Sequence, residues 1–309
     1  MVSSVVFDEM LFWQSNIKRL NCGKLEPDNT IEVPVVSDQA VVFCDASGAG
    51  FGGYVKGIDD SVVVGCWSET ESGLSSTWRE LEAVYRVLHS SVGCLEGREI
   101  IVNSDNKNVP SILKVGSKKP YLHDIALNVD NVCNTHNITL VPKWVPRENN
   151  TEADFPSRCT DSDDWSIKQF VFNDLERVWG PHTCDRFACS YNAKCANFNS
   201  KYWCPGTTSV DAFSVQWSGE NNWLVPTPRL INDCIIKIKK EQCKATLLVP
   251  MWKSAPFWPI CFQSDGEKAG FVHDCIVFQP RRLTRRGRGR NGIFDGRPLK
   301  FGFVALRFM

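Results

Sequence analysis

Hydrophobic residues occur in three short runs separated by polar or glycine-rich turns over residues 40–68. The stretch 40–57 consists of an apolar run, a glycine-rich turn and a second apolar run, and the stretch 61–68 contains the third. Nearly continuous apolar runs of this length are typical of strands that are buried on both faces of an α/β sheet. We therefore expect three consecutive strands in this part of the chain.

The next segment, 76–92, has the spacing of an amphipathic helix. Its apolar residues recur every three or four positions and form one face, made by Trp78, Leu81, Val84, Tyr85 and Leu88. Beyond this helix, strands are predicted at 98–105 and 137–148, and helices at 106–117, 120–137 and 150–159. Three strands, a helix and then alternating strands and helices predict an α/β fold, a mixed five-stranded sheet with flanking helices.

The polar stretch 160–166 separates this pattern from a second one. The second pattern is rich in Trp and Cys and contains an apolar run at 247–252 that predicts a buried strand. We predict a lead-in segment at 1–37, a first α/β domain at 38–162, a second, smaller α/β domain at 165–277 and a basic tail at 278–309.

Composition is that of an ordinary folded protein, with 43% hydrophobic and 23% charged residues. The 14 cysteines are spread from Cys22 to Cys275, without the dense framework of small secreted proteins. We recognise no signal peptide and no apolar stretch of membrane-spanning length. The expectation is an intracellular protein with reduced thiols, cytoplasmic or nuclear, that is neither secreted nor embedded in a membrane.

Four acidic residues occupy notable positions in the predicted elements. Asp45 and Asp105 each end an apolar strand, where an ionised carboxylate is costly unless it is paired or binds a metal ion. Each also has an ordinary interpretation, Asp45 as the first residue of a turn and Asp105 as the N-cap of the next helix. Glu80 likewise fits a helix capping box, and Asp154 fits an ion pair with Arg158.

The surroundings of these acids match four motifs in one order. They read Asp45-Ala-Ser-Gly-Ala-Gly-Phe-Gly-Gly, Ser76-Thr-Trp-Arg-Glu80-Leu, Ser104-Asp105-Asn106 and Asn150-Thr-Glu-Ala-Asp154-Phe-Pro-Ser-Arg158. In this order, over about 115 residues, they resemble the motifs of the ribonuclease H family. The resemblance implies that the predicted mixed sheet has the ribonuclease H-like arrangement.

The resemblance also implies roles for the four acids. Enzymes of this family hydrolyse phosphodiesters with two Mg²⁺ ions, and Mg²⁺ prefers carboxylate and phosphate oxygens as ligands. By this resemblance, Asp45 would bridge both ions, Glu80 and Asp105 would hold one of them, and Asp154 would hold the other. All four residues are therefore candidate catalytic and metal-binding residues.

The implied activity is Mg²⁺-dependent endonucleolytic cleavage of the RNA strand of RNA–DNA hybrids. The loop Val145-Pro-Arg-Glu-Asn-Asn stands where cellular enzymes of the family carry a glycine–histidine loop. Retrotransposon versions that resemble the DIRS and gypsy types also lack this histidine. We therefore expect part of a retrotransposon polyprotein, with upstream reverse transcriptase segments as a further candidate partner. The alternative is a non-catalytic nucleic-acid-binding relic of such an element.

A second resemblance falls on the segment 165–277. The stretches Trp179-Gly-Pro-His-Thr-Cys-Asp185, Asn192-Ala-Lys-Cys195 and Asn222-Trp-Leu-Val225-Pro-Thr-Pro228 are similar to phage-type adenine methyltransferases found in DIRS-type elements. Those enzymes carry Asn/Asp-Pro-Pro-aromatic where Val225 and Pro228 stand. Val has no acceptor and Pro does not stack on a flipped base, so adenosylmethionine is not expected as a cofactor. The alternative is a generic α/β accessory domain.

Basic residues provide candidate contacts to nucleic acid. Residues 281–309 contain eight Arg and one Lys against a single acid, Asp295, in a chain of zero net charge. Such a run is often a solvated, disordered segment, but it also suits phosphate contact or a nuclear address. The predicted nucleic-acid-binding residues are Asn106, Lys107, Arg281, Arg282, Arg285, Arg286, Arg288 and Arg290. For Asn106 and Lys107, a solvated loop explains the sequence equally well.

Overall fold

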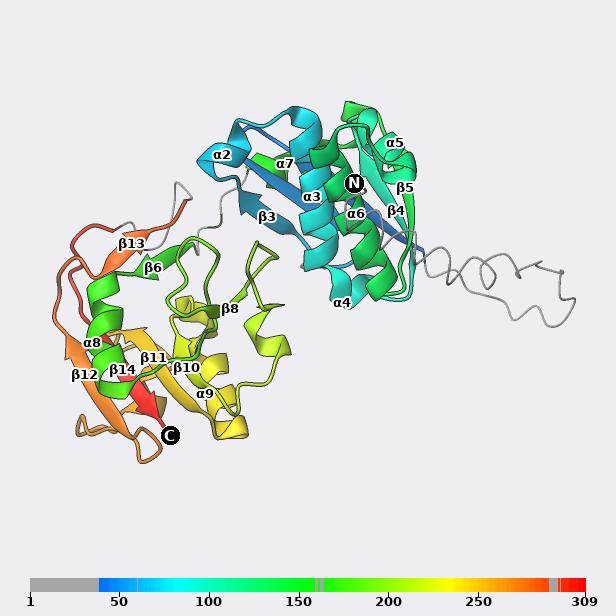
Figure 1. The fold of residues 1–309 in the computed structure, drawn as a ribbon. Helices are drawn as coiled ribbons and strands as arrows, with labels where there is room; N and C mark the ends of the chain where they lie inside the picture. Colours follow the sequence, from blue (N-terminus) through cyan, green and yellow to red (C-terminus); the bar gives the residue numbers. More distant parts are fainter. Residues whose placement is uncertain (1–38, 60, 159–160, 162–163, 289–293, 295) are drawn as a thin grey trace, which may run out of the picture. The chain divides into compact units, whose positions relative to one another are not determined.

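The computed structural model describes residues 39–59, 61–158, 161, 164–288, 294 and 296–309. The predicted lead-in segment at 1–37 lies outside these residues. Figure 1 shows two α/β regions, each with its own sheet. We call residues 39–158 the first region and the described residues from 164 to 309 the second region. Within the described chain, none of the helices is long and apolar enough to cross a membrane.

A five-stranded sheet of order β3-β2-β1-β4-β5 forms the centre of the first region. Strands β1, β2 and β3 pair antiparallel, whereas β4 runs parallel to β1 and β5 runs parallel to β4. The strands are β1 (Ala40–Ala46), β2 (Gly50–Val55), β3 (Val63–Cys66), β4 (Glu99–Ser104) and β5 (Thr139–Trp144). The mixed sheet with flanking helices is the predicted fold class, which is thereby confirmed.

Helices cover both faces of this sheet. A side chain at Gly52 of β2 would meet Pro156, whereas one at Gly53 would meet Val87. Because neighbouring strand residues point to opposite faces, the helices that carry Pro156 and Val87 lie on opposite sides. The helices are α2 (Glu69–Ser72), α3 (Ser76–Ser90), α4 (Val92–Leu95), α5 (Asn108–Val115), α6 (Pro120–Thr135), η1 (Arg147–Asn149) and α7 (Thr151–Arg158).

The apolar face predicted for residues 76–92 is the buried face of α3. Leu81, Val84 and Leu88 are fully buried in the core of the first region, while Trp78 and Tyr85 pack at its margin. The helix contacts β1, β2 and α6. This packing fixes α3 on the sheet, and with it every side chain that α3 presents toward the strand ends.

The second region contains a seven-stranded sheet of order β12-β14-β11-β10-β7-β8-β9. Neighbours from β11 through β10, β7 and β8 to β9 are parallel, and β14 runs antiparallel to both β11 and β12. The strands are β7 (Cys184–Asp185), β8 (Asn197–Ser200), β9 (Ser209–Val210), β10 (Asn221–Leu224), β11 (Lys244–Pro250), β12 (Asp274–Phe278) and β14 (Phe303–Phe308).

Shorter elements complete the second region. A two-stranded sheet pairs β6 with β13. These strands are β6 (Trp165–Ile167) and β13 (Thr284–Arg286), and the helices are α8 (Gln169–Trp179), η2 (Ala212–Ser214), η3 (Pro228–Leu230), α9 (Ile231–Glu241) and α10 (Trp258–Cys261). The apolar run predicted as a buried strand at 247–252 forms most of β11, whose residues after Lys244 are all buried.

The predicted boundary between residues 277 and 278 is wrong. β14 lies between β11 and β12, and all of its residues are buried. β13, within the arginine tract, pairs with β6 near the start of the region. Residues 278–309 are therefore not a separate basic tail, and the second region is larger than the smaller domain predicted at 165–277. The apolar run that follows the arginine tract forms β14, a strand with both faces covered.

Candidate metal centre

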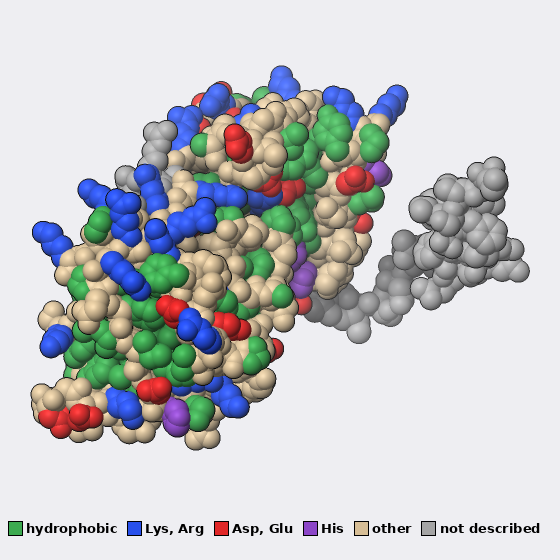
Figure 2. All heavy atoms as spheres, turned by 60° about the vertical axis from the view of Figure 1, so that its left-hand side comes forward, with side chains coloured by type: hydrophobic (Ala, Val, Ile, Leu, Met, Phe, Trp, Pro, Cys, Tyr) green, Lys and Arg blue, Asp and Glu red, His purple; other side chains and the backbone are tan. Residues whose placement is uncertain are grey.

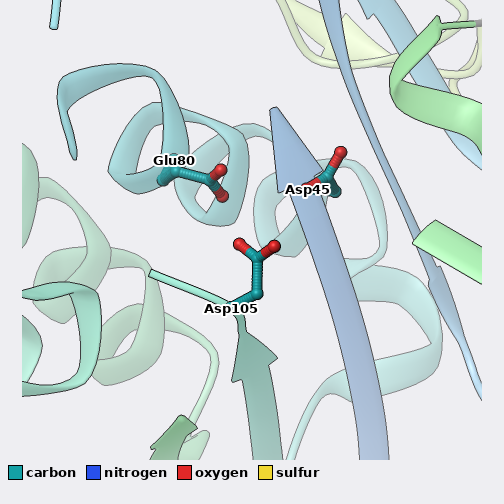
Figure 3. Close-up of side chains that lie close together, drawn as sticks. All are labelled: Asp45, Glu80 and Asp105. Carbon is teal, nitrogen blue, oxygen red and sulfur yellow. The ribbon is translucent and has the colours of Figure 1, made fainter. Parts of the chain in front are cut away.

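Three carboxylates of the first region converge at one edge of its sheet. One oxygen from each of Asp45, Glu80 and Asp105 lies within 4.8 Å of those of the other two. Figure 3 shows the three side chains pointing toward one another, from β1, from α3 and from the residue that follows β4. β1 and β4 are parallel neighbours, so their carboxyl ends meet at the same edge, and α3 places Glu80 beside them.

The ordinary interpretation of Asp45 as a turn residue is wrong. Asp45 still lies within β1, where it pairs with Gly52 of β2. The turn after it is closed by Ser47, whose hydroxyl accepts hydrogen bonds from the amides of Ala49 (3.2 Å) and Gly50 (3.0 Å). Asp45 is therefore a buried carboxylate at the end of a strand.

The capping interpretations of Glu80 and Asp105 are also wrong. The N-cap of α3 is Ser75, whose side chain accepts from the amide of Trp78, so Glu80 lies beyond the capping position. The N-cap of α5 is Lys107, which makes no side-chain capping hydrogen bond. Neither carboxylate is thus occupied in closing the end of its helix.

Asp154 is placed differently from the other three acids. It is absent from the described group of converging carboxylates, and its Oδ1 lies 2.6 Å from Arg158 and 3.7 Å from Arg147. The ion pair with Arg158 is the ordinary interpretation that the helix spacing allowed. Asp154 nevertheless lies close enough to raise the pKa of Asp45 by charge repulsion.

Two residues of α7 and the loop before it hold the end of β1, and sequence analysis assigned neither a role. Ser157 donates a hydrogen bond to Asp45 Oδ2 (2.6 Å), and Asn150 donates one to the carbonyl of Cys44 (3.0 Å). Both side chains are almost completely buried. The sequence could have indicated their role, because Asn150 and Ser157 both belong to the last of the four motifs.

Burial and mutual repulsion act on the carboxylates in the same direction. Burial, reinforced by the charges of Asp45 and Asp105, raises the pKa of Glu80 to about 9. Burial also raises the pKa of Asp45, against the opposing effect of the Ser157 hydrogen bond. In addition, Glu80 Oε2 is buried without a hydrogen-bond partner. Ionisation of Glu80 would leave this oxygen as an uncompensated negative charge, which is unfavourable unless a cation lies against it.

The donor set fits Mg²⁺. It consists of carboxylate oxygens alone, which hard divalent cations prefer, and the orphaned oxygen of Glu80 would gain a ligand bond. A cation would also compensate the repulsion among the three acids, which otherwise favours protonation. The three carboxylates could thus hold a divalent ion, whereas Asp154 would first have to leave its arginine partners.

The loop after Asp105 presents two of the predicted nucleic-acid-binding residues. Asn106 Oδ1 accepts from the amide of Asn108 (3.0 Å), which shapes the turn into α5. The ammonium of Lys107 lies 5.1 Å from the centroid of the Trp144 ring. Both residues directly follow Asp105 in the chain. Their contact with phosphate stays a prediction.

The arginine tract is partly folded. Arg281 lies 4.5 Å over the ring of Phe170, and Arg288 lies 4.3 Å over the ring of Tyr191. The interpretation of residues 281–288 as disordered is therefore wrong, because β13 pairs with β6, although the arginines are exposed to solvent; Arg290 lies outside the described residues. The exposed arginines of this stretch are Arg281, Arg282, Arg285, Arg286 and Arg288. Figure 2, which brings β13 forward, shows Lys and Arg side chains gathered on this face.

No family model and no curated protein matches the chain. Among solved structures, ribonuclease H1 of the archaeon Halobacterium salinarum is similar at 16% identity over 38% of this chain and 93% of that chain, with a TM-score of 0.32. The N-terminal ribonuclease H domain of a Mycobacterium tuberculosis protein is 21% identical over 38% of this chain and 89% of that chain, with a TM-score of 0.32. LC11-RNase H1 in complex with an RNA/DNA hybrid is 20% identical over 38% of this chain and 91% of that chain, with a TM-score of 0.33. At these values, neither activity nor substrate follows from the likeness.

Without a divalent cation, we expect the free energy of unfolding to fall as pH rises from about 5 to about 9. The pKa of Glu80 moves from an ordinary 4.5 to about 9 on folding, so in this window the folded state holds a proton that the unfolded chain has released. In urea unfolding measured across this pH range, the free energy of unfolding of the Glu80→Gln variant should depend less steeply on pH. Mg²⁺ should raise the free energy of unfolding of the native protein at high pH. The exposed Glu69→Gln is the matched control, and equal slopes in all three proteins would contradict the expectation.

Proposed function

We propose that the first region is a Mg²⁺-dependent ribonuclease H that cleaves the RNA strand of RNA–DNA hybrids. The observation that carries the proposal is the convergence of Asp45, Glu80 and Asp105 within 4.8 Å, with one oxygen of Glu80 left without a partner. The order of the four sequence motifs supports the same assignment. A cluster that only stabilised the fold would not place mutually repelling acids against one another in a buried position.

The residues of the site have distinct tasks in this proposal. Asp45, Glu80 and Asp105 would hold divalent ions, which would supply the activation of the attacking water and the stabilisation of the leaving oxygen. Asp45 is fixed by Ser157 and cannot rotate away from the site without losing that hydrogen bond. Glu80 and Asp105 approach the group from α3 and from the residue that follows β4.

Asp154 joins this group only after it exchanges its partners. The side chains of Arg147 and Arg158 are 75% and 61% exposed, so their ion pairs with Asp154 are well hydrated. Exposed pairs of this kind contribute only about 0–1 kcal/mol. We propose that metal and substrate together draw Asp154 toward Asp45, while the two arginines become free to pair with phosphate.

We further propose that the chain is part of a retrotransposon polyprotein, as the loop without glycine and histidine suggests. The alternative, a non-catalytic relic that still binds nucleic acid, has the same fold and the same charges. Turnover separates the two, because a relic binds hybrids but releases no cleaved RNA. We favour the enzyme, since the three acids and their support by Ser157 and Asn150 are all in place.

The substitution Asp45→Asn tests the nuclease directly. It keeps the size of the side chain and an acceptor for Ser157, but removes the charge that would bind the cation. We expect the rate of hybrid cleavage to fall on the order of 10²-fold or more, since each 1.36 kcal/mol of lost transition-state stabilisation is about a factor of ten. Hybrid affinity should be nearly unchanged, because it runs through phosphate contacts. The exposed Asp59→Asn serves as the control, and a native protein inactive with both Mg²⁺ and Mn²⁺ would favour the relic.

The arginine stretch is tested by substitution, because deleting it would also remove β13 and the buried Leu283 and Thr284. We expect the double variant Arg282→Ala with Arg285→Ala to weaken nucleic-acid binding for all sequences. The slope of log affinity against log salt should decrease by about 0.9 for each phosphate that is no longer neutralised. Arg177→Ala is the control, since this exposed arginine already pairs with Asp174 on α8. An unchanged slope would mean that the arginines do not touch phosphate.

For the second region, we propose a methyltransferase-like sheet without methyl transfer. In its favour, β7 and β10 are adjacent parallel strands, and the chain continues from them toward opposite edges of the sheet, to β8 and to β11. Ligands of such folds bind at the point where the strand order reverses. However, Val225 follows β10 and packs against the apolar core, so it offers no acceptor for an amine. We expect no transfer of labelled methyl groups from adenosylmethionine to adenine-containing DNA, and any incorporation above background would overturn this assignment.

A further inference from the structure

Trp144 is the last residue of β5 and is 44% exposed, which is unusual for a tryptophan beside a buried acidic group. β5 runs parallel to β4, and in their register Trp144 lies opposite Ser104, the residue before Asp105. The tryptophan therefore stands at the same edge of the sheet as the three carboxylates. Sequence analysis assigned it no role.

Two contacts tie Trp144 to the loop that carries Asp105. The indole Nε1–H donates a hydrogen bond to the carbonyl of Asp105 (2.9 Å), and the ammonium of Lys107 lies 5.1 Å from the ring centroid. Exposed cation–π pairs are worth only about 0.5–1 kcal/mol, so the packing of the fold does not by itself require this one. The indole thus fixes the backbone of an acid of the site while its ring holds a lysine in place.

We infer that Trp144 is a positioning residue for Asp105 and that, together with Lys107, it forms a contact for the sugar–phosphate backbone of a nucleic acid beside the carboxylates. The inference rests on the proposed nuclease function for its catalytic part only. The exposed ring offers an apolar surface to sugar, and Lys107 offers a positive charge to the adjoining phosphate. Both features are needed next to the acids, because a phosphodiester must be held while it is cut.

Single substitutions separate the two tasks. Trp144→Phe keeps a ring under Lys107 but removes the N–H donor, so Asp105 loses its support. We expect the Mg²⁺ concentration for half-maximal cleavage to rise by about tenfold, as is typical when a group that supports a metal ligand is removed. Hybrid affinity should stay close to that of the native protein. Lys107→Ala should show the opposite pattern, with an unchanged Mg²⁺ dependence and a salt slope of binding that is smaller by about 1.

Binding is measured by fluorescence anisotropy on a labelled RNA–DNA hybrid without divalent ions, and cleavage is measured separately across a Mg²⁺ series. Lys56→Ala is the matched control, because Lys56 is exposed and its amide bonds to Val41, at the other end of β1 from Asp45. Trp144→Ala should show both defects. If the native protein cuts no hybrid, the nuclease proposal fails. The anisotropy measurements would still test whether Trp144 and Lys107 contact the nucleic acid. Affinity and salt slope of Lys107→Ala and Trp144→Ala equal to those of Lys56→Ala would overturn the contact, and an unchanged Mg²⁺ dependence in an active Trp144→Phe would overturn the positioning role.

Discussion

The parallel pairing of β1 with β4 is the constraint on which the candidate metal centre depends. In this register Phe43 lies beside Asn103, so two residues later Asp45 on β1 and Asp105 directly after β4 reach the same edge of the sheet. A slip of one residue would turn a strand's side chains to the opposite face and separate the acids. The buried face of α3 then decides where Glu80 points, because Leu81 next to it is locked in the core.

Close approach between β2 and α7 is the second requirement. A β-carbon on Gly52 would lie 2.4 Å from that of Pro156, so only glycine allows α7 to lie against the strand at this point. Gly52 of the first motif is thus explained by this contact, since it lies within β2 and not in the turn. From its position on α7, Ser157 reaches Asp45, and its hydroxyl also bonds to the carbonyl of Asp154 (2.9 Å). The last motif therefore supports the first one across the sheet.

Electrostatics divide the four acids into two groups. Asp45, Glu80 and Asp105 lie together, and burial and like charge raise the pKa values of Asp45 and Glu80. Asp154 lies beside two arginines, whose charges compensate its own without a metal ion. A divalent ion would compensate the first group, whereas recruiting Asp154 only requires the exchange of hydrated ion pairs. In the proposed nuclease, the first group would hold the metal ion while Asp154 exchanges its partners.

The sequence by itself determined the elements of the first region and the order in which they carry Asp45, Glu80 and Asp105. Hydrophobic spacing reports which face of a helix or strand is buried, and the motifs report which acids belong together. Only the tertiary structure decided which residues from separate elements become partners. Asp154 pairs with Arg147 as well as with the expected Arg158, and Trp144 bonds to the backbone of Asp105. The same holds for β14, which enters its sheet between β11 and β12, two strands that precede it in the chain. These features depend on distances between residues far apart along the chain, and local spacing carries no information about such distances.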